Sequence, residues 1–121
     1  MKTLLSLLIT LAAANASANI YDCSGGSFEP LTVEVLNQKE VLLNGKEKGT
    51  VDFAYAKKNP EKKSYSILGF FPESLAAGAD GFSVDVTISK YMFAGSKVAY
   101  LNTYNRGPEG FYSESYKCIK R

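Results

Sequence analysis

Apolar and polar side chains alternate along most of the chain after residue 18, the pattern of strands that bury one face. The run FSVDVTI at 82–88 is the cleanest, since every second side chain in it is apolar, and LTVEV at 31–35 has the same pattern. Shorter runs of the same kind predict further strands at 41–43, 51–55, 65–68, 98–104 and 111–119. With a first strand around Cys23, the chain is expected to form about seven or eight short strands.

Turn-forming residues separate these runs. Asn44-Gly45 is a strong hairpin signal, because both residues tolerate positive φ. The stretch KKNPEKK at 57–63 predicts a solvated hairpin tip, and NRGPEG at 105–110 predicts another turn. The lysines at 57–63 would alternatively form a patch for anionic lipid headgroups or an acidic protein. Only 72–79 favours helix, over at most two turns.

Residues 1–18 predict a cleavable signal peptide. Lys2 supplies a positive start, the stretch at 4–14 is apolar, and small residues at Ala16 and Ala18 precede a cleavage point. This apolar stretch is short of the roughly 20 residues that cross a bilayer. We therefore expect a single domain at 19–121, periplasmic or secreted, without a membrane span.

The two cysteines lie close to the two ends of that domain. In an exported protein, Cys23 and Cys118 most simply form one disulfide. Each belongs to a Tyr-x-Cys segment, so Tyr21 shares a strand face with Cys23 and Tyr116 with Cys118. Pairing of the first strand with the last would close the sheet and remove its edges. The predicted fold is all-β, a small antiparallel up-and-down barrel, with a disulfide-bridged sandwich as the alternative.

Composition restricts the chemistry. Lys and Arg number 14 against 12 Asp and Glu, a balance that argues against nucleic-acid binding. The chain has no His, so it lacks the usual general base and a common metal ligand, and a disulfide would use up both thiols. We expect no enzyme activity, metal or cofactor. The least favoured alternative is a carboxylate-only enzyme around Glu114, which shares a strand face with Tyr116 and is expected to point inward or lie at a barrel mouth.

The aromatic residues suggest a recognition surface. Eight Tyr and seven Phe are more than one small core usually contains, and tyrosine gives a large contact area with a hydrogen-bonding tip. The candidate binding residues lie late in the chain and are Tyr100, Tyr104, Arg106 and Tyr112. Strand 98–104 is apolar on both faces, which also fits a strand bordering a ligand cavity. The alternative is that these rings fill the barrel and cover its ends.

One segment resembles a known family. YDCSGG at 21–26, a short barrel and a disulfide reaching the last strand are together similar to the periplasmic inhibitors of c-type lysozyme. This resemblance implies an enzyme inhibitor of the cell envelope. The segment Ser113-Glu114-Ser115-Tyr116 departs from the Ser-Gly-x-x-Tyr pattern of that family's inhibitory loop.

The sequence therefore predicts an exported, non-catalytic binding protein whose partner is a protein, with inhibition of an enzyme as one form of that function. The alternative is a lipocalin-like carrier of a small apolar ligand, which requires a hollow barrel.

Overall fold

The computed structural model describes residues 19–25, 29–75, 83–107 and 110–121, with the backbone alone at 83, 84, 105–107, 111 and 112. The predicted signal peptide at 1–18 lies outside these residues. So do residues 76–79 of the segment that was expected to favour helix. The part of that segment before residue 76 forms a turn, in which the Leu75 amide donates a hydrogen bond of 3.0 Å to the Phe71 carbonyl.

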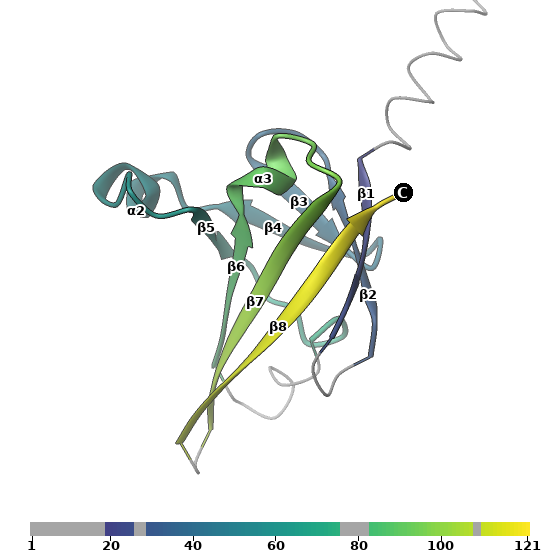
Figure 1. Cartoon of the computed structure of the whole chain (residues 1–121). Coiled ribbons are helices and arrows are strands. Elements are labelled where there is room, and N and C mark those ends of the chain that lie inside the picture. Colours follow the sequence, from purple (N-terminus) through teal and green to yellow (C-terminus); the bar gives the residue numbers. More distant parts are fainter. Residues whose placement is uncertain (1–18, 26–28, 76–82, 108–109) are drawn as a thin grey trace, which may run out of the picture.

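Eight antiparallel strands form a closed up-and-down barrel, in which each strand pairs with the next and the last pairs with the first (Figure 1). The prediction of a small all-β barrel is thus confirmed, and the sandwich is excluded. The strands are β1 (Ile20–Ser24), β2 (Leu31–Val35), β3 (Glu40–Leu43), β4 (Glu47–Val51), β5 (Ser64–Leu68), β6 (Ser83–Ser89), β7 (Val98–Gly107) and β8 (Gly110–Lys120).

Period-two alternation decides which side chains face the interior. In β2, Leu31, Val33 and Val35 are buried. The two residues between them, Thr32 and Glu34, are only partly buried. A register slip of one residue would expose all three apolar side chains, so the pattern fixes the pairing. The inward positions of the other strands supply the rest of the barrel core, including Tyr21, Val41, Leu43, Val51, Ile67, Val86, Ile88, Ala99, Leu101 and Tyr116.

The disulfide joins the strands that close the barrel. Cys23 and Cys118 lie directly opposite each other in the β1–β8 pair, with their Cα atoms 3.9 Å apart and an S–S bond between them. Tyr21 and Tyr116 are buried on the same inner face, as their spacing predicts. In the chain-entropy model, a crosslink over a separation of 95 residues stabilises the fold by about 4–5 kcal/mol.

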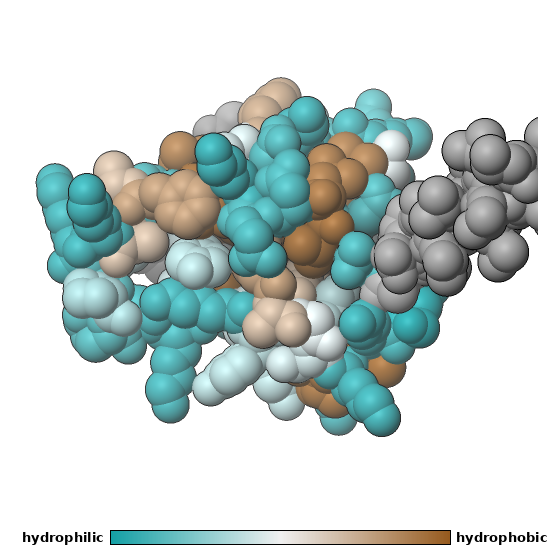
Figure 2. Space-filling view, turned by 90° about the horizontal axis from the view of Figure 1, so that it is seen from above, coloured by the Kyte–Doolittle hydropathy of each residue, from teal (hydrophilic) through white to brown (hydrophobic). Residues whose placement is uncertain are grey.

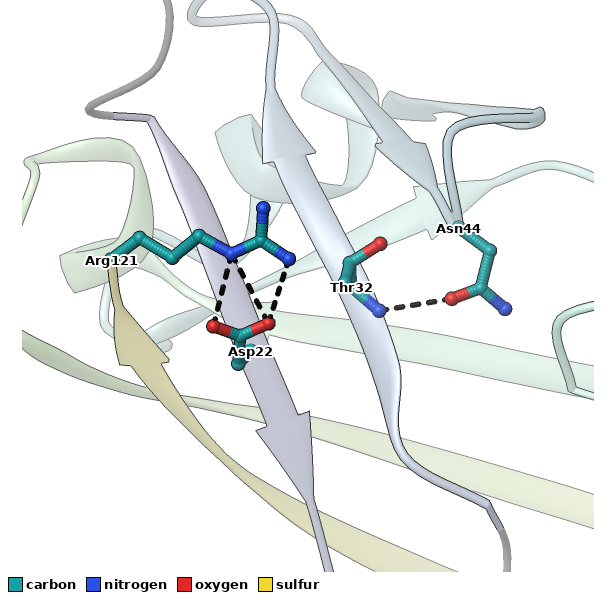
Figure 3. A network of polar contacts seen from close by, with 4 residues as sticks. All are labelled: Asp22, Thr32, Asn44 and Arg121. Carbon is teal, nitrogen blue, oxygen red and sulfur yellow. Dashed lines mark hydrogen bonds and ion pairs between the residues drawn. The ribbon is translucent and has the colours of Figure 1, made fainter.

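The predicted hairpin turn at Asn44-Gly45 is also confirmed. Both residues have positive φ, 51° and 69°, and the turn closes with a 3.0 Å hydrogen bond from the Lys46 amide to the Leu43 carbonyl. Asn44 extends the pairing to β2, because its Oδ1 accepts a 2.9 Å hydrogen bond from the Thr32 amide (Figure 3).

The prediction of a strand at 51–55 is wrong. β4 ends at Val51, and helix α2 (Phe53–Lys58) begins directly after it. Asp52 caps the helix, with its Oδ1 accepting a 3.1 Å hydrogen bond from the Tyr55 amide. This cap favours a helix over the strand that the alternating pattern predicts, because the Asp52 carboxylate satisfies a backbone amide that the first helical turn leaves unpaired. No residue of α2 is buried, and the helix stands out from the barrel at the left of Figure 1.

The lysine-rich stretch at 57–63 is exposed as predicted, but it is not the tip of a two-strand hairpin. Lys57 and Lys58 end α2, and the remaining residues turn back toward β5. The expected turn at 105–110 is likewise shorter than predicted. β7 continues to Gly107, which pairs with Gly110 of β8, so these two strands form a long arm that extends past the rest of the barrel in Figure 1.

A short helix that the sequence pattern did not indicate, α3 (Lys90–Phe93), covers one end of the barrel. Its Met92 and Phe93 are buried, because they pack onto the interior where β6 ends. Figure 2 views this end of the molecule and shows mostly hydrophilic side chains with small separate groups of apolar ones. Within the described residues, no helix has the length and apolar character needed to cross a membrane.

Candidate functional site

Small polar side chains form a row across the outer face of four neighbouring strands. Ser66 of β5 lies opposite Thr87 of β6, Thr87 lies opposite Asn102 of β7, and Asn102 lies opposite Ser115 of β8. The Ser115 hydroxyl donates a 2.6 Å hydrogen bond to Oδ1 of Asn102. In the adjacent row, Tyr104 stands between its cross-strand partners on β6 and β8.

Three members of this row, Ser66, Thr87 and Asn102, form the floor of a groove of about 320 Å³, which we call the outer groove. Its volume is at the lower end of the roughly 300–1,000 Å³ typical of small-molecule sites. Three segments supply its lining: helix α2, the turn before β5, and the outer faces of β5, β6 and β7. The lining residues are Tyr55, Lys62, Lys63, Ser64, Ser66, Thr87, Asn102 and Tyr104.

A backbone hydrogen bond and side-chain packing attach the α2 side of the groove to the barrel. The Asp52 amide donates a 2.9 Å hydrogen bond to the Ser66 carbonyl, so the start of the helix continues the pairing of β5. Phe53 packs edge-on against Tyr65 at 6.1 Å between ring centroids, and Tyr65 packs in the same way against Phe93 at 5.3 Å. The helix that carries Tyr55 is thereby anchored to the core, although none of its own residues is buried.

The turn that carries the groove's lysines is attached through Lys90. The Lys90 amide donates a 2.9 Å hydrogen bond to the Lys63 carbonyl, and its Nζ lies 5.2 Å from the centre of the Tyr65 ring. These contacts position the backbone of the turn and leave the side chains of Lys62 and Lys63 exposed.

Two of the four predicted binding residues have described side chains. Tyr100 and Tyr104 both point outward from β7, with 49% and 48% of their surfaces exposed. Tyr104 lines the outer groove, whereas Tyr100 lies beyond it, where its amide bonds the Ser89 hydroxyl at 3.1 Å. Arg106 and Tyr112 lie on the distal arm of β7 and β8, and their side chains are outside the described part of the structure.

Sequence reasoning missed most of the groove. Tyr55 was predicted to lie in a strand. Lys62 and Lys63 were predicted to lie at a hairpin tip, with a patch for anionic headgroups or an acidic protein as the alternative, but nothing in the sequence placed them beside Tyr104. Ser66 and Asn102 were not singled out, because a polar residue at an outward strand position has no distinctive sequence signal. The period-two pattern puts Tyr104 on the same strand face as Val98 and Tyr100, but only the structure shows that this is the outer face and which polar residues stand beside it.

A smaller group of polar side chains lies on the inner face of the barrel, away from the outer groove. Glu114 points to the inner face, as predicted, and is partly exposed; it lies opposite Thr103 and shares its face with Tyr116. Burial raises the pKa of Tyr116, and the negative charge of Glu114 raises it further. The hydroxyls of Thr103 and Tyr116 are buried, and neither has a hydrogen-bond partner among the described residues.

Among the described residues, the acids of four different segments do not point to a common side of the sheet. Glu34 and Asp85 point outward from β2 and β6, Asp52 caps α2, and Glu114 faces inward from β8. Over the residues that the structure describes, no three Cys, Asp or Glu side chains cluster closely enough to hold a metal ion.

An exposed ion pair connects β1 to the residue that follows β8. Arg121 donates hydrogen bonds to both carboxylate oxygens of Asp22, the shortest at 3.0 Å (Figure 3). The Arg121 hydrogen bonds lower the pKa of the Asp22 carboxyl below its usual value. Because both side chains are exposed, this ion pair contributes little to the free energy of unfolding.

Comparison with protein-family models, with curated proteins and with solved structures gave no match to this chain. The sequence resemblance to lysozyme inhibitors rested on the segment at 21–26, the short barrel and the disulfide, and residues 113–116 departed from it. In the structure residues 113–116 lie inside β8 and pair with Tyr104 to Leu101 of β7, so they form a strand and not a loop. None of the comparisons supports the resemblance.

Proposed function

We propose that this is an exported, non-catalytic binding protein that recognises its partner through the outer groove. The observation that carries the proposal is the combination of two exposed tyrosines, Tyr55 and Tyr104, with a floor of serine, threonine and asparagine side chains. Tyrosine with serine and asparagine is the composition of adaptable binding surfaces. The rings supply contact area at a low entropy cost, and the small polar groups supply hydrogen bonds.

The rigidity of the groove supports the same proposal. Its floor belongs to three paired strands of a closed barrel, and its α2 wall is anchored through Phe53 and Tyr65. A site that is formed before binding loses less conformational entropy when its partner arrives. The disulfide between Cys23 and Cys118 is consistent with export, since such bonds persist in oxidising compartments.

The carrier alternative has less support. It depended on strand 98–104 being apolar on both faces, as a cavity-lining strand would be. In the structure, Val98, Tyr100 and Tyr104 stand on the outside of the barrel, and the inner face holds Ala99 and Leu101, both buried. The outer groove is lined by tyrosine, lysine, serine, threonine and asparagine, with no aliphatic side chain among them, so it offers little that is specific to a small apolar ligand.

Quantitative capture tests the proposal. The disulfide-bonded protein is immobilised, exposed to cell-envelope and secreted fractions, and its bound proteins and glycans are measured by mass spectrometry. Tyr104→Ala is expected to reduce specific capture about tenfold, the effect of losing one binding hot spot. Tyr91→Ala is the matched control, because Tyr91 is equally exposed but belongs to α3 and not to the groove.

Equal capture by wild type, Tyr104→Ala and Tyr91→Ala would show that the groove is not the recognition site. Equal loss in both variants would show that exposed tyrosines bind without specificity. Either result contradicts the proposal.

A further inference from the structure

We infer that the outer groove binds an acidic saccharide. This inference rests on the proposed function, and it adds the chemical class of the ligand. It depends on three properties of the groove: the charge at one end, the hydrogen-bonding groups of the floor, and the two aromatic rings.

The charge at one end of the groove is positive. Lys62 and Lys63 line it, and Lys57 and Lys58 of α2 lie in the same exposed segment. Three acids lie beside the groove without lining it: Asp52 accepts the hydrogen bond of the Tyr55 amide at the start of α2, Glu61 is in the turn, and Asp85 lies opposite Tyr104 on β6. Among the described residues that line the groove, none is acidic, so a ligand with carboxylate or phosphate groups is favoured.

The floor matches a ligand rich in hydroxyl groups. The hydroxyls of Ser64, Ser66 and Thr87 can each donate one hydrogen bond and accept two. Asn102 accepts from Ser115 through Oδ1, which orients its amide and leaves the Nδ2 group to donate to a ligand. Sugar hydroxyls are both donors and acceptors, so they can satisfy such a set completely.

The rings give the groove its apolar contacts. Tyr55 and Tyr104 come from different elements, α2 and β7, and are 43% and 48% exposed. An aromatic face offers a flat surface on which the C–H face of a sugar ring can pack, and the phenol hydroxyl remains available at its edge.

An acidic peptide is the competing ligand, and the lining argues against it. The core of a protein interface is enriched in apolar side chains and depleted of charged ones. The described lining of the outer groove contains no aliphatic side chain, and two of its members are lysines. Its chemistry is therefore closer to that of a polar small-molecule site than to the centre of a protein interface.

The test is a titration of the disulfide-bonded protein followed by ¹⁵N NMR, with three probes. Trigalacturonate is acidic and a saccharide, maltotriose is a neutral saccharide, and hexaglutamate is an acidic peptide. Trigalacturonate is expected to bind saturably, about tenfold or more tightly than either other probe. Its largest shifts are expected at Thr87, Asn102 and Tyr104.

Variants connect this binding to the groove. Lys62→Ala with Lys63→Ala, and separately Asn102→Ala, are each expected to weaken trigalacturonate about tenfold. The control is Lys46→Ala with Lys48→Ala, which removes the same charge from exposed positions on the β3–β4 hairpin. Equal weakening in the control would show that net charge alone attracts the probe, and it would overturn the inference.

Two other results would overturn it as well. Tighter binding of hexaglutamate than of trigalacturonate would identify an acidic peptide as the ligand. Absence of saturable trigalacturonate binding, while Tyr104-dependent capture succeeds, would refute the ligand class and leave the proposed function intact. If the capture also fails, the proposed function itself is wrong.

Discussion

Thr103 and Glu114 lie directly opposite each other across β7 and β8, and both point toward the interior of the barrel. Thr103 is 2% exposed, and within the described part of the chain its hydroxyl has no hydrogen-bond partner. Burying a hydroxyl without a partner costs about 1–3 kcal/mol. The buried Thr103 hydroxyl therefore lowers the free energy of unfolding of the barrel.

Thr103→Val should remove that cost, because valine has nearly the same shape and no hydroxyl. We expect the free energy of unfolding to rise by about 1 kcal/mol in urea denaturation. Thr50→Val, at an exposed position on β4, is the control and should leave stability unchanged. A loss of stability in Thr103→Val would mean that the hydroxyl has a partner in solution, such as a buried water.

The alkaline limit of stability should depend on the buried tyrosines. Burial raises the pKa of Tyr21 and of Tyr116 above that of a tyrosine in the unfolded chain. Their contribution is fully present below about pH 10, where both states are neutral, and is lost as pH rises toward the folded-state pKa. Unfolding free energy should therefore fall above pH 10, and Tyr116→Phe should make this fall less steep.

Tyr91→Phe is the control for that experiment, because Tyr91 is exposed on α3. Lysines also titrate in this range, so the informative quantity is the difference between each variant and the wild type. Parallel profiles for wild type and Tyr116→Phe would show that burial does not perturb Tyr116.

Removal of the disulfide should weaken the barrel at its closing pair of strands. Cys23→Ala with Cys118→Ala is expected to lower the free energy of unfolding by about 4–5 kcal/mol, since the unfolded chain is no longer crosslinked over 95 residues. Urea denaturation measures the change, and thiol titration of the wild type should find no free sulfhydryl. A loss below about 1 kcal/mol would show that β1 and β8 stay paired without the bond.

Asp52 connects local helix capping to the groove. Asp52→Ala should destabilise α2 by about 1 kcal/mol, because the Tyr55 amide loses its acceptor. Amide exchange is then expected to accelerate within Phe53–Lys58 and to stay unchanged in β7. Trigalacturonate should bind less tightly to this variant, since Tyr55 is no longer held in place. Unaltered exchange in α2 would show that packing of Phe53 on Tyr65 alone maintains the helix.

Local patterns predicted the barrel well. The alternation at 31–35 and 82–88 depends only on neighbours in sequence, and the Asn44-Gly45 turn depends only on two residues with positive φ. The closure of the barrel was also predictable, because the matching Tyr-x-Cys segments place Cys23 and Cys118 on the same type of inner face.

The outer groove was not predictable in the same way. Thr87 and Asn102 become neighbours only through the register of β6 and β7, which no local pattern specifies. Tyr55 reaches the groove only because Asp52 ends β4 and starts a helix, where alternation alone predicted a continuing strand. The groove is built from three strands and helix α2, and the patterns of the separate segments do not show how these elements lie next to one another.

The proposed recognition through the outer groove takes place on the outer face of β5–β7. Site-specific photo-crosslinking in living cells tests this most directly, with the photoreactive residue placed singly at Asp85 or Ser113, the two cross-strand neighbours of Tyr104, and, as controls, at Glu34 on β2 or Thr50 on β4. The same discrete adduct is expected from Asp85 and Ser113 and none from Glu34 and Thr50. An adduct formed only from the control positions, or equally from all four, would contradict it.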